Sequence, residues 1–399
     1  MTKKFYIFLL LFFINVPLFA RDIDLDSVYL EKSSGLYREI TSAKEKLYTR
    51  ISSLYIDSNV IFAGWRNGDE IVYIKEFSQL NIVYKYNRNS REKTEIARFS
   101  GNVTYADLNK TGNIIYAKIL SIDDSGRAKA ESVIININSR EITRKSSRYL
   151  FIDYTMHPSD DYVISESKDG IHKTSLINSA SKLIIPSSKY NDIASGNDPV
   201  LAYISPDEKK TAIITGSGGV YKTKILTEQG DQTLSGVSSC SDFRWIDNNR
   251  IVYMSGGVGN YSVKVYDVAA KKSKELISGT LNPDINYSDK PGIITGLENQ
   301  IIIVIPYDLN SRIETGLEGE EAYFSPDGRR FTSIYLGKLY VTSLNMIEKY
   351  RLDIRRSAEE LVRLYKKAAD MKSIWHSDYS KEYINKKIKQ YDKFLKMNQ

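Results

Sequence analysis

Short stretches in which hydrophobic and polar residues alternate recur along most of the chain. Ile114-Ile115-Tyr116-Ala117 and Val263-Lys264-Val265-Tyr266 are two of them. A period of two is typical of strands that bury one face. Clusters of Asn, Asp, Pro and Gly separate the stretches, and these residues favour tight turns. The pattern predicts short strands joined by turns from about residue 59 to residue 348.

An aromatic residue followed by a turn sequence marks a repeating unit. Tyr154 precedes His157-Pro158-Ser159-Asp160, Tyr203 precedes Ser205-Pro206-Asp207-Glu208, and Tyr323 precedes Ser325-Pro326-Asp327-Gly328. The intervals from Tyr105 to Tyr154 and from Tyr154 to Tyr203 are both 49 residues. A unit of four strands every ~40–45 residues is typical of a propeller blade. We therefore predict an all-β protein, a β-propeller of seven blades, with six as the alternative.

Helical periodicity appears at both ends of the chain. Apolar residues recur every three or four positions from about Leu36 to Leu54, after Ser33 and Ser34, which can cap a helix. A strand around residues 53 to 61 that completes the last blade is the alternative for part of this segment. After Tyr350 the pattern predicts two amphipathic helices, the first near the capping sequence Ser357-Ala358-Glu359-Glu360. The expected divisions are 21–58, partly helical, 59–348, the propeller, and 349–399, a basic helical tail.

The first twenty residues have the layout of an export signal. Lys3 and Lys4 precede an apolar run from Phe5 to Val16, and Ala20 ends the segment. The run is short for a helix that crosses a hydrocarbon layer of ~30 Å. We expect cleavage after Ala20 and a periplasmic location. Cys240 is the only cysteine, so no intramolecular disulfide can form, and we expect it to be a small buried residue.

The turns and the strands after them resemble a known repeat. Ser-Pro-Asp-Gly at 325 to 328, Ser-Pro-Asp-Glu at 205 to 208, and the strands Phe331 to Tyr335 and Leu339 to Thr342 resemble the WD40-like (PD40) propeller repeat of the TolB-like family. The resemblance extends over about 60 to 345. It implies an exported propeller and does not identify a partner.

The positive charge of the chain belongs to its tail. The formal net charge is +7, and residues 351 to 399 hold thirteen Lys and Arg against seven Asp and Glu. This distribution argues against a nucleic-acid-binding propeller. The basic helical face predicts contact with an anionic membrane surface, and a merely solvated face is the alternative. The lysines proposed for this contact are Lys386, Lys387, Lys389 and Lys393.

No catalytic or metal-binding constellation stands out in the sequence. The three histidines, His157, His172 and His376, lie in different contexts, and no Gly-x-Ser-x-Gly motif is present. Asp22, Asp24 and Asp26 alternate like the start of a calcium loop, but Ser27 stands where glycine is required. We predict no catalytic residue, no cofactor and no metal ion.

The function predicted from these observations is recognition. We expect a non-enzymatic periplasmic propeller that binds another cell-envelope protein or polymer through its turns. A propeller hydrolase or lyase that acts on a glycan is the alternative, and an assembly scaffold with the tail as an oligomer contact is a third interpretation. The candidate contact residues are His157, Asp160, Ser205, Asp207, Asp247, Asn248, Ser325 and Asp327.

Overall fold

The computed structural model describes most of the chain from Leu25 to Met397. It leaves out residues 53, 79, 123–127, 148–153, 157–161, 176–179, 195–199, 218–219, 240–242, 258–259, 281–284, 289–292, 299–300, 307–308, 310–311, 320 and 378. The predicted export signal, Cys240, His157 and Asp160 therefore lie outside the described residues. The described strands form seven four-stranded sheets. The pairings among the described strands are antiparallel, as alternating sequences with tight turns lead one to expect.

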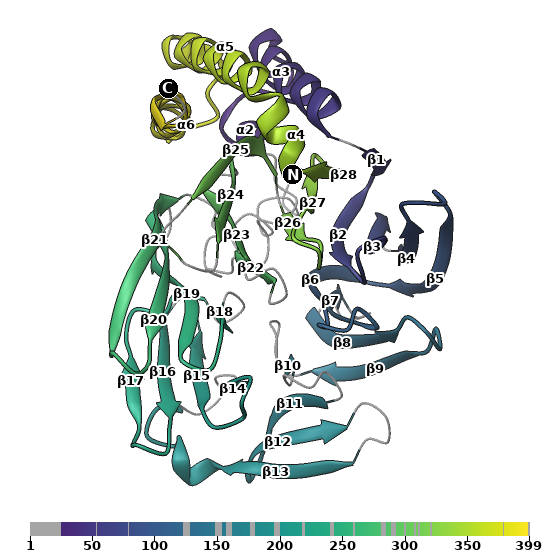
Figure 1. Ribbon diagram of the computed structural model, residues 1–399, viewed down its shortest axis with the longest axis vertical. Coiled ribbons are helices and arrows are strands. Elements are labelled where there is room, and N and C mark those ends of the chain that lie inside the picture. Colours follow the sequence, from purple (N-terminus) through teal and green to yellow (C-terminus); the bar gives the residue numbers. More distant parts are fainter. Residues whose placement is uncertain are drawn as a thin grey trace. The chain divides into compact units, whose positions relative to one another are not determined.

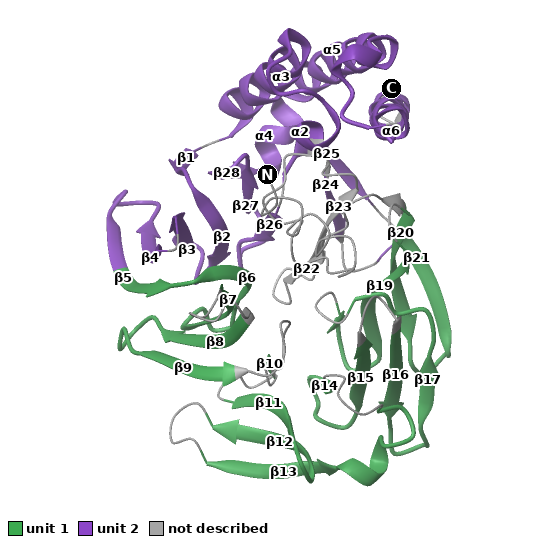
Figure 2. Ribbon diagram, turned by 180° about the vertical axis from the view of Figure 1, so that it is seen from behind, with its two compact units in different colours: residues 1–19, 96–281 green, residues 20–95, 282–399 purple. Residues whose placement is uncertain are grey.

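The chain divides into two compact units, shown in different colours in Figure 2. The first covers residues 96–281 and contains four complete sheets. In pairing order these are β6 to β9 (Asn102–Leu108, Ile114–Ile122, Ala128–Asn136, Ile142–Ser147), β10 to β13 (Tyr154–Met156, Tyr162–Ser167, Gly170–Ser175, Ser181–Pro186), β14 to β17 (Val200–Ile204, Thr211–Ser217, Val220–Leu226, Gln232–Leu234) and β18 to β21 (Phe243–Trp245, Arg250–Gly257, Asn260–Asp267, Lys272–Thr280). A short 3-10 helix, η2 (Ser187–Lys189), follows β13.

The second unit joins two segments that are far apart in the sequence, residues 20–95 and 282–399. Its first sheet is β2 to β5 (Val60–Trp65, Glu70–Phe77, Leu80–Asn87, Lys93–Ser100), whose last strand crosses the unit boundary. A second sheet is β22 to β25 (Ile285–Ser288, Ile293–Glu298, Ile301–Pro306, Ile313–Glu318). A further sheet joins β26 to β28 (Glu321–Phe324, Arg330–Tyr335, Lys338–Ser343) with β1 (Leu54–Asp57). Leu54 pairs with Val341 across β1 and β28. The alternative of a strand from the N-terminal segment is therefore correct.

Helices from both ends of the sequence lie together in the second unit, beside β25 (Figure 1). They are α2 (Leu25–Tyr29), α3 (Gly35–Ile51), α4 (Leu344–Lys349), α5 (Arg351–Asp370), η3 (Lys372–Ile374) and α6 (Ser380–Met397). Ser34 caps α3 by accepting a hydrogen bond from the Tyr37 amide at 3.1 Å. None of the described helices is both long and apolar enough to cross a membrane.

The expected start of the first tail helix was wrong. Ser357 lies in the interior of α5, which begins at Arg351. Buried residues of α5 already begin at Ile354, so packing extends the helix through the local capping sequence.

Two tryptophans tie neighbouring sheets together. The Trp65 Nε1 group donates to the Tyr323 carbonyl oxygen at 3.0 Å, which joins β2 to β26 in the second unit. In the first unit, Trp245 Nε1 donates to the Tyr203 carbonyl oxygen at 2.8 Å and joins β18 to β14. Both indole rings are buried, so each satisfies its one polar atom on the backbone of the next sheet. The predicted β-propeller of four-stranded units with helices at both ends is confirmed.

Candidate interaction surfaces

The Ser-Pro-Asp turns use their polar side chains within the turn. Ser325 Oγ donates to Asp327 Oδ1 at 2.5 Å, and the same carboxylate oxygen accepts the Arg329 amide at 3.1 Å. Ser205 and Asp207 repeat this arrangement at 2.6 Å. The Ser205 and Ser325 hydroxyl groups are buried. These four residues therefore hold the turns rigid, and their side chains have little left to offer a partner.

The other predicted contact turn follows the same logic. Asp247 Oδ1 accepts the backbone amides of Asn249 and Arg250 at 2.8 and 2.7 Å, and Asp247 Oδ2 pairs with the Arg250 guanidinium. The backbone carbonyl of Asn248 accepts a hydrogen bond from Lys210 Nζ at 2.9 Å. This last contact links the turns of two sheets in the first unit, which stiffens both.

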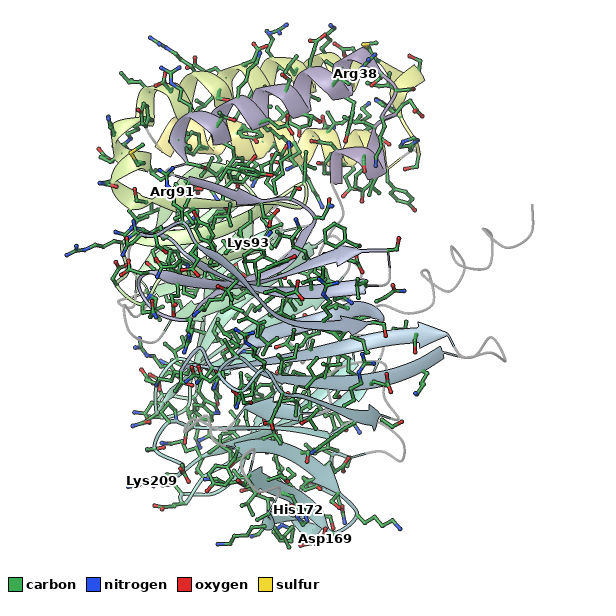
Figure 3. The ribbon with its side chains drawn as sticks, turned by 90° about the vertical axis from the view of Figure 1, so that its right-hand side faces the viewer. Arg38, Arg91, Lys93, Asp169, His172 and Lys209 are labelled. Carbon is green, nitrogen blue, oxygen red and sulfur yellow. The ribbon has the colours of Figure 1, made fainter. Side chains whose placement is uncertain are left out.

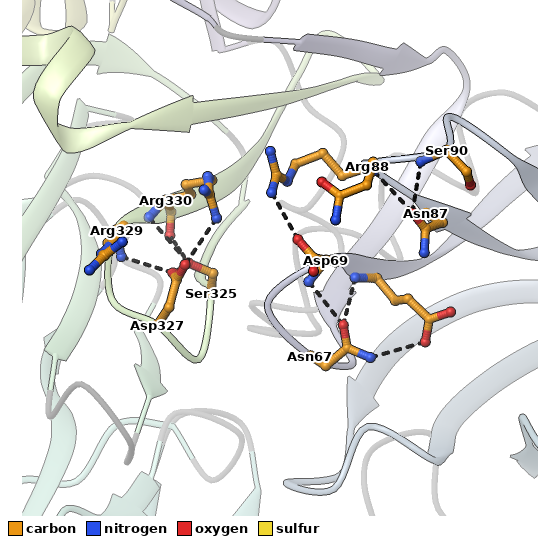
Figure 4. Close-up of polar contacts among 11 residues, drawn as sticks. Asn67, Asp69, Asn87, Arg88, Ser90, Ser325, Asp327, Arg329 and Arg330 are labelled. Carbon is orange, nitrogen blue, oxygen red and sulfur yellow. Dashed lines mark hydrogen bonds and ion pairs between the residues drawn. The ribbon is translucent and has the colours of Figure 1, made fainter.

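Three neighbouring turns of the second unit form what we call the turn face: residues 66–70, 87–92 and 325–330 (Figure 4). The β2–β3 and β4–β5 turns lie at the same end of their antiparallel sheet. The hydrogen bond from Trp65 to Tyr323 brings the ends of β2 and β26, just before their turns, together. Asn67 and Asn87 fix their turns by accepting two backbone amides each.

Arginines supply most of the charge of the turn face, and the sequence analysis missed them. Three are paired: Arg66 with Glu70 at 3.1 Å, Arg88 with Asp69 at 2.8 Å, and Arg330 with Asp327 at 2.9 Å. Two others, Arg91 and Arg329, are exposed and have no ion pair among the described residues. Glu92 is an exposed carboxylate of this face and has no ion pair within the described part of the chain. The turn face thus presents fixed polar backbone and two exposed guanidinium groups. The sequence signal that could have identified these arginines is their position in or next to turn sequences.

Of the four lysines predicted to face outward from the tail, one does not. Lys389 and Lys393 are exposed, and Lys386 is partly exposed and pairs with Glu382 at 3.2 Å. Lys387 is fully buried, so its proposed contact with an anionic surface was wrong. Its Nζ group instead lies 2.8 Å from Glu318 Oε1 on β25.

Lys387 belongs to a buried ionic cluster of two carboxylates and two ammonium groups, formed by Asp26, Lys44, Glu318 and Lys387. Lys44 Nζ lies 2.6 Å from Asp26 Oδ2 and 2.5 Å from Glu318 Oε2. The four residues come from α2, α3, β25 and α6, all of the second unit. Opposite charges alternate and cancel. A buried ion pair requires such full compensation, because desolvation of an isolated charge costs several kcal/mol.

Tyrosine hydroxyl groups complete the hydrogen bonding of the cluster. Tyr365 and Tyr383 donate to Asp26 Oδ1 at 2.6 and 2.9 Å, and Tyr391 donates to Glu318 Oε1 at 2.5 Å. Tyr48 donates to the Glu318 carbonyl oxygen. Asp26 is thus bound by one ammonium group and two phenols.

The charged groups of the cluster shift the pKa values of one another. Burial alone would raise the pKa of Asp26, but the charges of Lys44 and Lys387 and the hydrogen bonds from Lys44 and Tyr365 hold that pKa below its ordinary value. The pKa of Glu318 is lowered in the same way, against burial, chiefly by Lys387 and Lys44. Burial lowers the pKa of Lys387, whereas Asp26 and Glu318 overcome burial at Lys44 and raise its pKa. The role of the cluster is therefore structural: its ion pairs hold α2, α3, β25 and α6 together.

One chain of hydrogen bonds resembles catalytic machinery. His172 and Asp169 lie close together (Figure 3), with His172 Nε2 2.7 Å from Asp169 Oδ1. His172 Nδ1 lies 3.1 Å from Ser181 Oγ. The Ser181 hydroxyl also contacts Thr174 Oγ1 at 3.0 Å. Asp169 and Ser181 are exposed. Asp169 lies in the turn before β12, and Ser181 is the first residue of β13. An exposed Ser–His–Asp chain lacks the water-excluded surroundings that make such groups effective, and here it joins two paired strands.

Within the part of the chain that the structure describes, no three His, Cys, Asp or Glu side chains gather as metal ligands would. His172 lies near one carboxylate, that of Asp169, and His376 lies near another, that of Glu31.

Comparison with known proteins supports the fold. No family model matches the chain, and no curated protein matches it. Among solved structures, a chain in a crystal structure of a mitotic checkpoint complex aligns with 74% of this chain and 93% of its own length, at 12% identity and a TM-score of 0.51. A chain of hydrazine synthase from Kuenenia stuttgartiensis covers 74% of this chain and 98% of its own, at 12% identity and a TM-score of 0.50. TolB from Acinetobacter baumannii aligns over 54% of this chain and 53% of its own, at 14% identity and a TM-score of 0.36. At such sequence identities a structural likeness shows the fold alone. The TM-score of the TolB alignment is too low to support an argument.

Proposed function

We propose that this protein is an exported propeller of the TolB-like, WD40-like repeat type that binds another cell-envelope protein or polymer and catalyses no reaction itself. The observation that carries this proposal is the turn face, on which exposed arginines stand on turns fixed by internal hydrogen bonds. The leader sequence of residues 1–20 supports export and a periplasmic location.

Stiff turns suit recognition because binding then orders few groups. The backbone of each turn is already held by Asn67, Asn87 or Asp327, so a partner immobilises only the side chains that it touches. Arginine is enriched among the residues that contribute most to protein interfaces, and its planar fork binds carboxylates with two hydrogen bonds. Arg91 and Arg329 are therefore the contacts from which we expect the largest share of binding.

The test removes one of these charges and reverses the other, at two positions whose side chains do not hold the turns. In Arg91→Asn/Arg329→Glu, asparagine tolerates the positive φ of 59° at position 91. We expect the double variant to capture its partner from crosslinked envelopes at a yield reduced about tenfold or more, which corresponds to the loss of one charge-assisted contact. The matched control, Lys366→Glu, changes an exposed cation of α5 and should capture the same species as the unchanged protein.

Only species lost in the double variant and kept in the control count in favour of the proposal. Equal capture by all three proteins would contradict a role for the turn face. Product release from a panel of glycans by the purified protein would instead favour the hydrolase or lyase alternative.

We further propose a second contact, between the outer face of α6 and an anionic membrane surface. Lys381, Lys389, Lys393 and Lys396 are exposed on α6, against the acidic Glu382 and the partly exposed Asp392. Each lysine near such a surface contributes about 1 kcal/mol, and salt screens the contribution. Removal of the tail is unsuitable as a test, because a chain ending at Tyr350 would lose Tyr365, Tyr383, Lys387 and Tyr391, which complete the buried cluster.

Point substitutions give the cleaner measurement. Lys389→Gln/Lys393→Gln should reduce co-sedimentation with vesicles that contain phosphatidylglycerol at low salt, by about tenfold or more in affinity. Lys168→Gln/Lys209→Gln removes two exposed charges from the first unit and serves as the control. If both double variants pellet as well as the unchanged protein, the α6 face does not bind membranes.

A further inference from the structure

A cleft of about 580 Å³ lies in the first unit, between β17 of one sheet and the strands β19 to β21 of the next. These strands run beside one another in both ribbon views (Figures 1 and 2). The cleft belongs to neither the turn face nor the helices. Its lining is mostly polar, and the residues that the argument uses are Asp231, Gln232, Tyr253, Lys264, Lys271 and Ser273.

Hydrogen bonds between the two sheets fix the walls of the cleft. The Tyr266 hydroxyl donates to Gln232 Oε1 at 2.9 Å, and Gln232 Nε2 donates to the Val268 carbonyl oxygen at 3.1 Å. Within the second of these sheets, the Tyr253 hydroxyl lies 3.0 Å from Ser273 Oγ. Tyr253 and Tyr266 are buried in the hydrophobic core of this unit. The cleft is therefore present before any ligand arrives, which lowers the entropy cost of binding.

The cleft carries an excess of positive charge. Lys264 and Lys271 line it, and neither has an ion pair among the residues that the structure describes. Its one carboxylate, Asp231, lies 3.3 Å from Lys224 Nζ, which also pairs with Asp192 at 3.0 Å, and the two lysines of the lining outnumber this carboxylate. Glu275 is opposite Lys264 in the strand register but does not line the cleft.

We propose that this cleft binds an acidic saccharide. Its volume lies within the ~300–1,000 Å³ range of small-molecule sites. Two ammonium groups can hold a carboxylate, and the Thr233, Ser235 and Ser273 hydroxyl groups can both donate to and accept from sugar hydroxyl groups. An apolar ligand would leave these polar groups without partners. The inference does not rest on the turn face, which belongs to the other unit.

The experiment measures binding to the full mature chain by titration calorimetry. A hyaluronan tetrasaccharide, which carries glucuronate carboxylates, should bind, and the neutral chitotetraose should bind at least about tenfold more weakly. Lys264→Met/Lys271→Asn should abolish this preference. Asparagine suits position 271, where φ is 52°. The control Lys272→Met, next to Ser273 but on the opposite side of β21, should keep the preference.

Each outcome bears on the proposal. Equal affinity for the charged and the neutral saccharide, or an unchanged preference in the double variant, would overturn it. So would binding of inorganic phosphate with displacement of the tetrasaccharide at equal concentration, since the cleft would then be a simple anion site. Because the turn-face variants leave these residues untouched, failure here leaves the partner hypothesis standing, and the reverse holds as well.

Discussion

Replacing Lys387 by methionine is expected to lower the free energy of unfolding by about 3–5 kcal/mol. The substitution keeps the length of the side chain but leaves Asp26 and Glu318 with only Lys44 between them. One negative charge then stays buried without compensation. The loss should be visible in urea denaturation followed by tryptophan fluorescence, with Trp375, next to η3, as a reporter within the helices of the second unit.

Lys386→Met is the matched control. It removes the neighbouring positive charge of the same helix, that of Lys386. The ion pair of Lys386 with Glu382 is largely exposed, so the substitution should change stability by less than about 1 kcal/mol. If the two substitutions destabilise the protein equally, and by less than about 1 kcal/mol, the buried cluster does not hold the helices as described.

Replacing Gly316 by alanine is expected to cost about 2–3 kcal/mol of stability or more. The residue lies on β25 with a φ of 70°, a conformation that is strained for alanine. A Cβ atom there would lie 2.4 Å from Ile354 Cγ2 of α5 and 3.1 Å from Phe394 Cζ of α6. Either β25 or both tail helices would have to move.

Gly68→Ala provides the comparison, measured by the same denaturation. Gly68 lies in the β2–β3 turn, and nothing lies within 4 Å of a Cβ atom placed there. We expect a change of less than about 1 kcal/mol. A similar small effect at Gly316 would mean that the tail helices do not pack on β25.

The strands could be predicted from the sequence because their signal is local. Alternation in Val263 to Tyr266 and the turn at Ser325 to Gly328 depend on neighbours along the chain, and each is confirmed as a strand or turn. The borrowed strand β1 was left open because Leu54 pairs with Val341, far away in the sequence. Pairing across such a distance leaves no periodic trace in either segment.

The buried cluster could not be predicted for a related reason. Lys387 and Lys386 are adjacent lysines of an amphipathic helix, and composition does not show which one turns inward toward Glu318. Lys44 stood among the apolar positions of its helix, and its two partners lie 18 and 274 residues away. The candidate contacts fared likewise. Turn chemistry identified Ser325 and Asp327, but only the structure shows that their side chains are used internally and that Arg329 is left exposed.

The most direct test of the central claim, that the turn face recognises an envelope partner, is site-specific photocrosslinking in intact cells. A photoreactive benzoylphenylalanine would replace Arg329 in one strain and Lys366 in another. We predict a discrete adduct at position 329 that is absent at position 366. No adduct at position 329, together with one at position 366, would place the partner on the helices and contradict the proposal.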